Sequence, residues 1–210
     1  MKTRITYLTA LCASVVMMTA CSGEETTAEK EQEQVEICQY SYNHGSTTLE
    51  WTAYKTNDKV GVPGGFNEIM VESETSEDPI DVIESISFTI NTSSVETNNE
   101  DRNGKVAEHF FGTINTEEIT GSIKELKDDG NAVIEINMNG IAFNIEGQYE
   151  LDGSDFSFET SIDVVNWNAL SGIEALNEVC KDLHTGKDGV SKLWSEVTLS
   201  LSTSLSSDCD

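Results

Sequence analysis

Basic residues are scarce in this chain of 210 residues, which carries 12 lysines and arginines against 38 aspartates and glutamates. The formal net charge is −26. A field of that sign repels nucleic acid and anionic lipid headgroups, so a DNA or RNA partner is excluded. The excess of acid is typical of a protein that stays soluble in a salty medium, where screening makes surface charge tolerable.

Histidine is scarce too, with only His44, His109 and His184 in the chain. Neither a His-Glu-x-x-His metal motif nor a Gly-x-Ser-x-Gly nucleophile motif occurs. Cys180 and His184 are spaced to share one helical face, but a metal site needs two further ligands. We therefore expect no catalytic residue, no metal and no enzyme activity. A metal-dependent or redox role for Cys180 and His184 is kept as a minor alternative.

One stretch has the beginning of a calcium loop, because Asn99, Asp101 and Asn103 alternate ahead of Gly104. The bidentate carboxylate that completes such a loop belongs at the position of Phe110, which has no oxygen ligand to offer. The spacing therefore argues against calcium.

Long apolar runs are missing after the N-terminus, and spanning a bilayer takes about 20 apolar residues. Residues 1–20 place two basic residues before an apolar run, which is typical of a bacterial secretion signal. Met18 to Cys21 resembles a lipobox, so we expect a lipoprotein whose signal peptide, 1–20, is removed and whose Cys21 carries the lipid anchor. Secretion with an unmodified Cys21 is the alternative.

The polar, acidic stretch that follows, 21–36, is predicted to be a disordered tether. The expected location is the bacterial cell envelope, anchored to the outer membrane through the N-terminal acyl chains. The periplasmic and the surface-exposed side are both left open.

Cysteine is limited to five residues, of which one leaves with the signal and Cys21 is the expected anchor. Three remain, so at most one intrachain disulfide can form, and an envelope location permits it. Cys38 with Cys180 is the preferred pair. Cys180 with Cys209 is the runner-up, because Cys209 falls in a tail, 206–210, that is predicted to be frayed. Sequence alone does not decide the connectivity.

What the chain has in abundance is two-residue alternation of apolar and polar side chains, from Leu49 onward. In the longest runs, 141–151 and 156–164, this alternation predicts strands with one apolar and one polar face. The same pattern predicts shorter strands at 49–53, 86–90, 134–138 and 197–201.

Tight hairpins are indicated between neighbouring runs by Asn139-Gly140 and Asp152-Gly153, which favour positive φ angles. Such a sheet forms a sandwich or closes on itself, and closure alone removes the exposed edges. We predict an all-β fold, an antiparallel up-and-down β-barrel of about eight strands with two short helices, over residues 37–205. A barrel of that size is filled by side chains or holds one slender ligand.

The two helices are predicted at 104–111 and 171–184. Ser171 and Glu174 have the spacing of a capping box, which favours a start at Ser171. The apolar stripe of the second helix is expected to pack against the sheet and to close one of its ends; it consists of Ile173, Leu176, Cys180 and Leu183.

Three pieces of sequence occur in a specific order: Ser94-Val95-Glu96-Thr97, then Arg102, then His109-Phe110-Phe111. Together they resemble the signature of the YceI-like family. The likeness extends upstream to 51–66 and downstream to 119–122 and 138–141, and it covers about residues 47–203.

This resemblance implies a lipocalin-like barrel that encloses a long polyisoprenoid, such as an isoprenoid quinone or alcohol, without catalysis and without another cofactor. Burial of a prenyl chain gains about 25 cal/mol per Å² of apolar surface. For each lumen candidate, ordinary core packing is the alternative to ligand contact. The apolar lumen candidates are Trp51, Phe66, Phe88, Phe110, Phe111, Ile136, Met138, Phe143, Ile145, Phe158, Ile162 and Leu199.

The chain departs from the family pattern at three places. Asn103 stands where the family has Asp, Gly112 replaces the Asp after the double Phe, and 166–189 is an insertion. The sequence thus favours a membrane-tethered carrier or binding protein for a long apolar lipid. The alternative is a solidly packed structural or surface-interaction lipoprotein without a ligand.

Overall fold

The computed structural model describes residues 37–209. The predicted signal peptide, the anchor Cys21 and the predicted tether lie outside the described residues. In chain order the strands are β1 (Cys38–Ser41), β2 (Thr48–Lys55), β3 (Val60–Phe66), β4 (Ile69–Glu72), β5 (Ser87–Asn91), β6 (Val95–Glu96), β7 (Glu118–Leu126), β8 (Asn131–Met138), β9 (Ile141–Asp152), β10 (Asp155–Asp163), β11 (Leu193–Ser204) and β12 (Ser206–Cys209).

The helices of the described chain are short. They are α1 (Pro79–Glu84), α2 (Glu100–Lys105), α3 (Leu170–Val179) and α4 (Lys181–His184), with the 3-10 turns η1 (His44–Ser46), η2 (Thr92–Ser94) and η4 (Val164–Trp167) and the π-helix η3 (Val106–Phe111). None of them has the length and apolar character needed to cross a bilayer.

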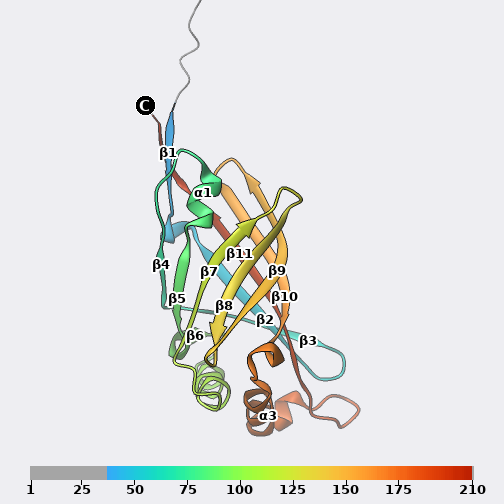
Figure 1. Cartoon of the computed structure of the whole chain (residues 1–210). Helices are drawn as coiled ribbons and strands as arrows, with labels where there is room; N and C mark the ends of the chain where they lie inside the picture. The colour runs from blue at the N-terminus through green and yellow to red at the C-terminus, as the bar shows by residue number, and fades with distance from the viewer. Residues whose placement is uncertain (1–36, 210) are drawn as a thin grey trace, which may run out of the picture. The chain divides into compact units, whose positions relative to one another are not determined.

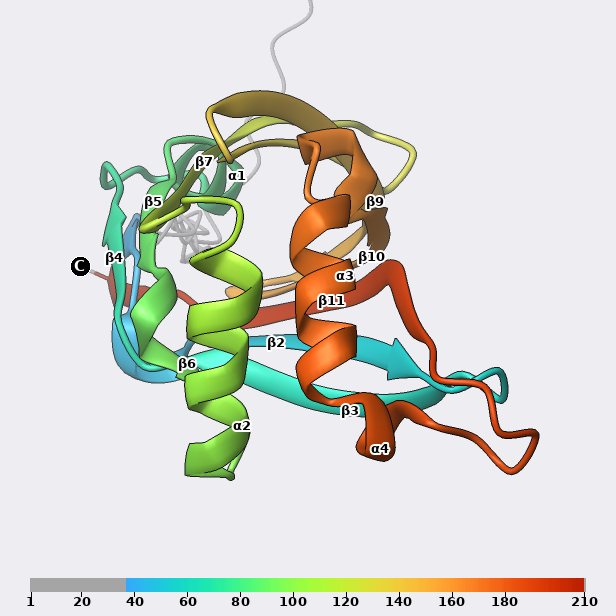
Figure 2. The same ribbon diagram turned by 90° about the horizontal axis from the view of Figure 1, so that it is seen from below.

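Ten strands form one antiparallel sheet in the order β4-β5-β7-β8-β9-β10-β11-β2-β3-β6. From β7 to β11 each strand pairs with the next one in the chain, which is the predicted up-and-down connection. The sheet curls on itself, with α2 and α3 side by side across one end (Figure 2). The predicted all-β, antiparallel fold is confirmed, with a two-stranded ribbon of β1 and β12 added to the main sheet.

The β8–β9 hairpin follows the predicted turn chemistry, whereas the β9–β10 turn lies one residue later than predicted. Asn139 and Gly140 join β8 to β9 with φ angles of 51° and 68°. In the β9–β10 hairpin Asp152 still pairs with Asp155, so the turn is made by Gly153 and the residue after it, with φ of 62° at Gly153. Glycine adopts a positive φ angle without steric cost, so Gly140 and Gly153 suit these turns.

One end of the curled sheet is closed by α1, a helix that the alternation pattern does not predict (Figure 1). The side chain of Asp78 caps it by accepting from the Ile80 amide at 2.9 Å, and Pro79 occupies its first turn. Val82 and Ile83 are fully buried in the core. The helix is thus held by two apolar side chains rather than by a long amphipathic face.

The opposite end carries α2, η3 and α3 (Figure 1). The helix predicted at 104–111 begins earlier, at Glu100, where the Asn99 side chain caps it by accepting from the Arg102 amide at 2.9 Å. The predicted capping box is wrong, because α3 begins at Leu170, before Ser171, and Ala169 precedes it without a side-chain cap.

The predicted apolar stripe of this helix is correct only in part. Ile173 and Cys180 are buried, whereas Leu183 is 61% exposed. A break in the helix at Cys180, between α3 and α4, rotates Leu183 away from the sheet.

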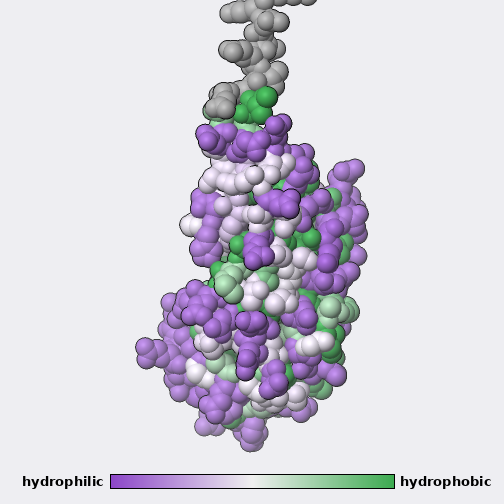
Figure 3. Space-filling model, turned by 60° about the vertical axis from the view of Figure 1, so that its left-hand side comes forward, coloured by the Kyte–Doolittle hydropathy of each residue, from purple (hydrophilic) through white to green (hydrophobic). Residues whose placement is uncertain are grey.

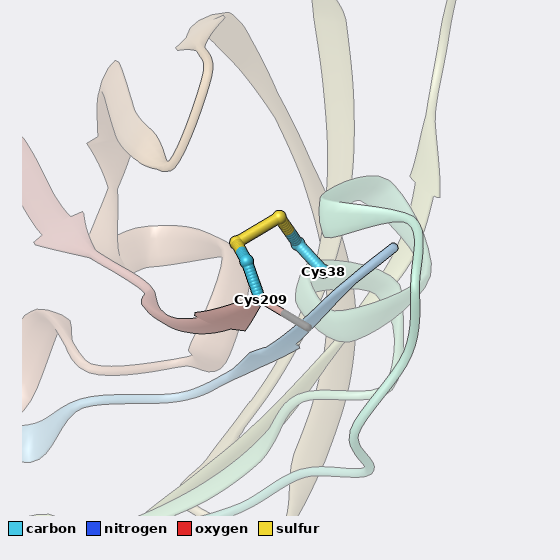
Figure 4. Close-up of a disulfide and its surroundings, with 2 residues drawn as sticks. All are labelled: Cys38 and Cys209. Carbon is cyan, nitrogen blue, oxygen red and sulfur yellow. A yellow bond between two sulfur atoms is a disulfide. The ribbon is translucent and has the colours of Figure 1, made fainter. Parts of the chain in front are cut away.

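The disulfide joins Cys38 to Cys209, so both predicted pairings with Cys180 are wrong (Figure 4). The physical reason is that β1 pairs with β12 in antiparallel register, which places Cys38 opposite Cys209. Cys180 lies at the helix end of the sheet, buried and free. The predicted frayed tail is also corrected, because Ser206–Cys209 is a paired strand.

Candidate functional site

The curled sheet encloses an apolar cavity of about 160 Å³. Its wall is built almost entirely from side chains of the inner faces of the strands. Nine of the twelve predicted lumen residues line it, namely Trp51, Phe66, Phe88, Ile136, Met138, Ile145, Phe158, Ile162 and Leu199. The strand alternation therefore identified the inner face of the sheet.

A second apolar cavity, of about 140 Å³, lies between the sheet and the helices α3 and η3. Phe110 and Phe111 line this cavity rather than the first one. Their rings meet edge to face at 4.9 Å between centroids, and Phe111 also packs on Phe66 at 6.0 Å. The two cavities adjoin because they share lining residues, among them Trp51 and Phe66.

Phe143 is the one predicted lumen residue that lines neither cavity, so this prediction is wrong. It is 39% exposed, although it pairs with the inward-facing Ile136. Trp167 is fully buried and lines the first cavity, with its ring edge-on to Phe143 at 5.4 Å. The indole from η4 thus takes the inner position, and Phe143 packs behind it.

Three aromatic rings of the cavity wall lie close to glycines of neighbouring strands. A Cβ atom built on each of these glycines would come within 2.3 to 2.6 Å of a ring atom. Any larger residue would therefore push the ring toward the cavity or out of the wall. The pairs are Trp51 with Gly64, Phe88 with Gly121 and Phe158 with Gly147.

These glycines were missed by the sequence reasoning, because their role depends on strand register. Trp51 is the cross-strand partner of Gly64, and Phe88 is the partner of Gly121. An aromatic residue opposite a strand glycine is a known packing arrangement, but the pairing has to be known first.

The polar atoms of the tryptophan rings are turned into the wall. Trp51 Nε1 donates to the carbonyl oxygen of Gly65 at 3.3 Å, and Trp167 Nε1 donates to that of Ile136 at 3.0 Å. The surface of the cavity is therefore formed almost only by carbon atoms. An apolar cavity of this kind and size stays dry and takes up apolar molecules.

The sheet opens sideways where β3 leaves β2. From Lys55 back to Trp51 the two strands pair, but beyond Gly64 β3 turns to pair with β6. The start of β2 is left without a partner on that side, and a groove of about 480 Å³ lies there. The groove and the first cavity share Tyr42, Thr47, Leu49, Phe66 and Ile69, so the groove adjoins the cavity.

The face that carries β1 and β4 is mostly hydrophilic, with a paler and partly apolar zone in its middle (Figure 3). In the groove itself the charged lining residues are Glu50 and Glu96. Hydrogen bonds from the Asn103 side chain and the Asn98 amide lower the pKa of the Glu96 carboxyl, so this group is ionised at neutral pH.

The Cys180–His184 pair is buried at the helix end. His184 Nδ1 lies 3.0 Å from Asn177 Oδ1, and burial, with a smaller effect of Lys55, lowers the pKa of His184 to about 4. Burial also raises the pKa of the Cys180 thiol. The pair is therefore neutral near pH 7, and residues 37–209 contain no group of three or more metal-ligating side chains placed to hold a metal.

The stretch that resembles half a calcium loop uses its oxygen atoms for local structure. Asn99 caps α2, and Asn103 Oδ1 accepts from the amide and the hydroxyl of Thr97 at 2.8 and 2.6 Å. Asp101 forms an ion pair with Lys105 at 2.6 Å. These contacts explain the polar residues without a bound ion.

The family departure at Gly112 has a steric explanation. Gly112 ends the π-helix, and its amide donates to the carbonyl oxygen of Ala107 at 2.9 Å. A Cβ atom at this position would lie 2.3 Å from the carbonyl oxygen of Glu108. Any side chain would therefore disturb the turn that positions Phe111.

Comparison with known proteins adds a family and a fold. The model of a family described as the YceI-like domain matches residues 40–205. A polyisoprenoid-binding domain from Saccharophagus degradans superposes with a TM-score of 0.58 at 13% identity, covering 82% of this chain and 99% of that chain. BcnA from Burkholderia cenocepacia superposes with a TM-score of 0.55 at 15% identity, covering 80% and 99%. No curated protein matches the sequence. At these identities the solved structures show the fold alone.

Proposed function

The chain belongs to the YceI-like family, and from this premise we propose that it binds a long apolar lipid, of the polyisoprenoid class, inside the curled sheet. The observation that carries the proposal is the dry apolar cavity together with the second cavity that adjoins it. The structural neighbour from Saccharophagus degradans is described as polyisoprenoid-binding, which supports the same ligand class.

The size of the first cavity favours a binding protein over a solidly packed structural barrel. Leaving about 160 Å³ of apolar space empty costs on the order of 4 kcal/mol, at about 24 cal/mol per Å³. A barrel with a purely structural role would gain that energy by carrying larger side chains. The glycines next to Trp51, Phe88 and Phe158 leave the cavity wider instead of filling it, because they leave room for the rings to lie away from the lumen.

Binding by this route is passive and requires no catalytic group. An apolar chain enters, and burial of its surface retains it, at about 25 cal/mol per Å². Each cavity is smaller than the roughly 300 Å³ at which ligand pockets begin. A long chain therefore has to span both, and Trp51 and Phe66, which line both cavities, have to adjust as it enters.

Lipid analysis of the full chain, purified from membranes, tests the proposal. Native mass spectrometry and solvent extraction are expected to detect an isoprenoid bound to the wild type. Ile162→Trp places a large ring where both cavities meet and is expected to lose the lipid. Val165→Trp, at a position 46% exposed, is the matched control that keeps it. Absence of isoprenoid from the wild type under several expression conditions, or equal lipid in all three proteins, would contradict the proposal.

We also propose that the protein is held in the cell envelope by acyl chains on Cys21. The support is the sequence at 18–21 alone, which lies outside the described residues. Cys21→Ser is expected to move the protein from the membrane fraction to the soluble fraction, and mass spectrometry of the wild type is expected to show diacylglycerol on Cys21. An unmodified N-terminal cysteine would favour plain secretion instead.

A further inference from the structure

The few basic residues of the protein gather in two segments, 55–60 and 178–196. Of the 12 basic and 38 acidic residues of the chain, three and seven lie outside residues 37–209, which leaves nine and 31. The two segments hold five of these nine basic residues and only five of the 31 acidic ones. The rest of residues 37–209 carries four basic against 26 acidic residues. The two segments, called the platform below, are therefore neutral within an otherwise strongly acidic chain.

Hydrogen bonds join the two segments into one surface. The amide of Thr56 donates to the Lys192 carbonyl oxygen at 2.8 Å, and the Asn57 side chain donates to the Asp188 carboxylate at 2.6 Å. Trp194 Nε1 donates to the Thr56 carbonyl oxygen at 2.7 Å. The β2–β3 hairpin and the loop between α4 and β11 consequently lie side by side at the helix end of the sheet (Figure 2).

Exposed aliphatic side chains lie among the lysines of the platform. Leu183 is 61% exposed and Val190 48%, and Val60 and Val179 are exposed as well. These are four of the ten large apolar side chains that are exposed in residues 37–209. Apolar side chains beside lysines, whose stems are apolar and whose ends are charged, are typical of surfaces that lie at a membrane interface.

Screening determines which charges an approaching surface meets. At physiological salt the Debye length is about 8 Å, so a bilayer that touches the platform interacts with its balanced charges and little with the acidic remainder. Contact elsewhere would bring mostly carboxylates to the lipid phosphates. A stable protein interface instead buries about 800 Å² on each partner, more than a few separate aliphatic side chains provide. Charge and area together favour a lipid surface over a protein partner.

The platform also borders the second cavity. Leu193 and Trp194 belong to the platform and line that cavity, as does Leu176 of α3. Lys192 Nζ lies 3.2 Å from the centroid of the Trp194 ring. One short segment thus contributes to the cavity wall and to the exposed surface. A lipid that leaves the cavity beside Trp194 would enter a bilayer in contact with the platform without crossing water.

We propose that the platform docks on a phospholipid bilayer, with Leu183 and Val190 among the head groups and with Lys181 and Lys187 on lipid phosphates. Lipid then passes between the second cavity and the bilayer at this contact. Docking goes beyond the proposed function, whereas the transfer step rests on it. Leu183 and Lys187 belong to the insertion 166–189, which the family pattern lacks, so the resemblance does not imply this surface.

The length of chain before the described residues permits this docking. Cys38 begins β1 at the α1 end of the sheet, opposite the helix end (Figure 1). The 12 residues of β11 span about 40 Å at about 3.3 Å per residue. The predicted tether, 21–36, spans up to about 50 Å if it is extended. The platform can therefore reach the membrane in which Cys21 is proposed to be anchored.

Vesicle flotation tests docking, with vesicles of phosphatidylethanolamine and a minor share of phosphatidylglycerol in physiological salt. The mature chain from residue 21 is used with Cys21→Ser, so that no acyl chain holds it to the vesicles. This protein is expected to float with them. Leu183→Ser combined with Val190→Ser is expected to weaken binding at least about tenfold, because two aliphatic side chains lose their burial. Met70→Ser, at a position on β4 that is 66% exposed, is the matched control that keeps binding.

Charge reversal tests the part of the lysines. Lys181→Glu combined with Lys187→Glu is expected to weaken binding to these vesicles by about tenfold. Lys124→Glu combined with Lys127→Glu makes the same change of net charge on either side of Leu126, whose amide donates to Glu84 of α1. This control is expected to bind like the parent protein, because its charges are screened from the bilayer.

Transfer of a fluorescent geranylgeraniol from the loaded protein to the vesicles tests the route. The rate is expected to rise with vesicle concentration. The Leu183 and Val190 double variant is expected to transfer more slowly, while its Kd for the probe without vesicles stays that of the parent. An unchanged Kd also shows that the variant is folded.

The outcomes separate docking from the function proposed above. If the parent protein does not float, or if the platform variants float as well as their controls, docking is wrong, and lipid binding stands as long as the probe binds. A transfer rate that is independent of vesicle concentration would overturn the route. If the probe does not bind at all, the proposed function fails, and flotation still decides whether the platform docks.

Discussion

At the scale of single residues, the width of the cavity depends on glycines that leave room for the aromatic rings of its wall. Trp51 lies across β3 only because Gly64 opposite it has no Cβ atom, which would approach the indole to 2.3 Å. The ring is also held by the hydrogen bond from Nε1 to the Gly65 carbonyl oxygen. A single methyl group at Gly64 would therefore disturb the packing of the wall and would also narrow the lumen.

Gly64→Ala is expected to displace the Trp51 indole and to destabilise the protein by about 1–3 kcal/mol, the usual effect of overpacking. Bound lipid is expected to fall in parallel, because the ring moves toward the lumen. Urea denaturation and lipid extraction measure the two effects. Gly104→Ala is the control: an added Cβ atom there has nothing within 4 Å, and alanine in a helix gains about 0.5–1 kcal/mol. A Gly64→Ala protein with wild-type stability and lipid content would contradict this account of the wall.

His184 gives the protein a specific dependence on pH. Burial lowers its pKa from 6.5 to about 4, so below pH 6.5 the unfolded chain takes up a proton that the folded chain rejects. The contribution to stability is complete above pH 6.5 and is lost as the pH falls toward 4. The expected loss is about 1–2 kcal/mol, since solvent near the ring screens part of the effect.

The measurement compares denaturation of wild type and His184→Gln between pH 7.5 and 4. Protonation of carboxylates affects both proteins alike, so the difference between the two curves isolates His184. His184→Gln is expected to be less stable than wild type at pH 7.5, and this difference in the free energy of unfolding is expected to shrink as the pH falls. Parallel curves over the whole range would show that the folded protein accepts the proton on His184.

The residues that face inward were predictable where the alternation along one strand decides which way a side chain points, and not where a second element intervenes. The two-residue period of a strand is sufficient to place Ile136, Ile145 and Phe158 on the inner face. The position of Phe143 depends on Trp167, which reaches the same place from a different element. No period along one strand contains that information.

At the scale of elements, the ribbon of β1 and β12 lies beside the groove and is tied by the Cys38–Cys209 disulfide. The bridge closes a loop with a sequence separation of 171 residues, and long loops gain most from closure. β1 leads directly to Tyr42, so the ribbon also positions one wall of the groove.

Reduction of the disulfide, or replacement of both cysteines by alanine, is expected to lower the free energy of unfolding by about 2–5 kcal/mol. Thermal denaturation with and without a thiol reductant measures the change. The melting temperature of the double variant is expected to be the same with and without the reductant. The melting temperature of Cys180→Ala is expected to fall on reduction, as that of wild type does. Loss of the reductant effect in Cys180→Ala would instead assign the bridge to Cys180.

Long elements were predictable and short ones were not. β8, β9, β10 and β11 contain several periods of alternation each, whereas β1, β4, β6 and β12 have between two and four residues and show no period. The start of α1 was signalled by Asp78 and Pro79, but six residues are too few for an amphipathic pattern. The disulfide was mispredicted for the same reason, because it depends on the pairing of two such short strands.

At the scale of the whole molecule, both ends of the curled sheet are covered, by α1 at one end and by α2, η3 and α3 at the other (Figures 1 and 2). The lateral groove, which shares lining residues with the cavity, lies away from both of these covered ends. The alternation predicted the class of fold but not this side opening, because the opening depends on β3 leaving β2 beyond Gly64.

The net charge of −26 acts on the molecule as a whole. Ion pairs such as Lys59–Glu196 at 2.6 Å and Lys124–Glu135 at 3.1 Å join exposed side chains, and exposed pairs contribute about 0–1 kcal/mol each. Most carboxylates have no such partner within residues 37–209, so repulsion among them dominates at low ionic strength. Salt at physiological strength shortens the Debye length from about 30 Å to about 8 Å and screens this repulsion.

Raising NaCl from about 0.01 M to about 0.15 M is therefore expected to stabilise the protein, by on the order of 1 kcal/mol. Urea is the denaturant of choice, since guanidinium chloride is itself a salt. KCl is expected to match NaCl, because screening depends on ionic strength and not on the identity of the cation. A stability that falls as salt is added would mean that the exposed ion pairs outweigh the repulsion, and a difference between the two cations would point to specific ion binding by the acidic surface.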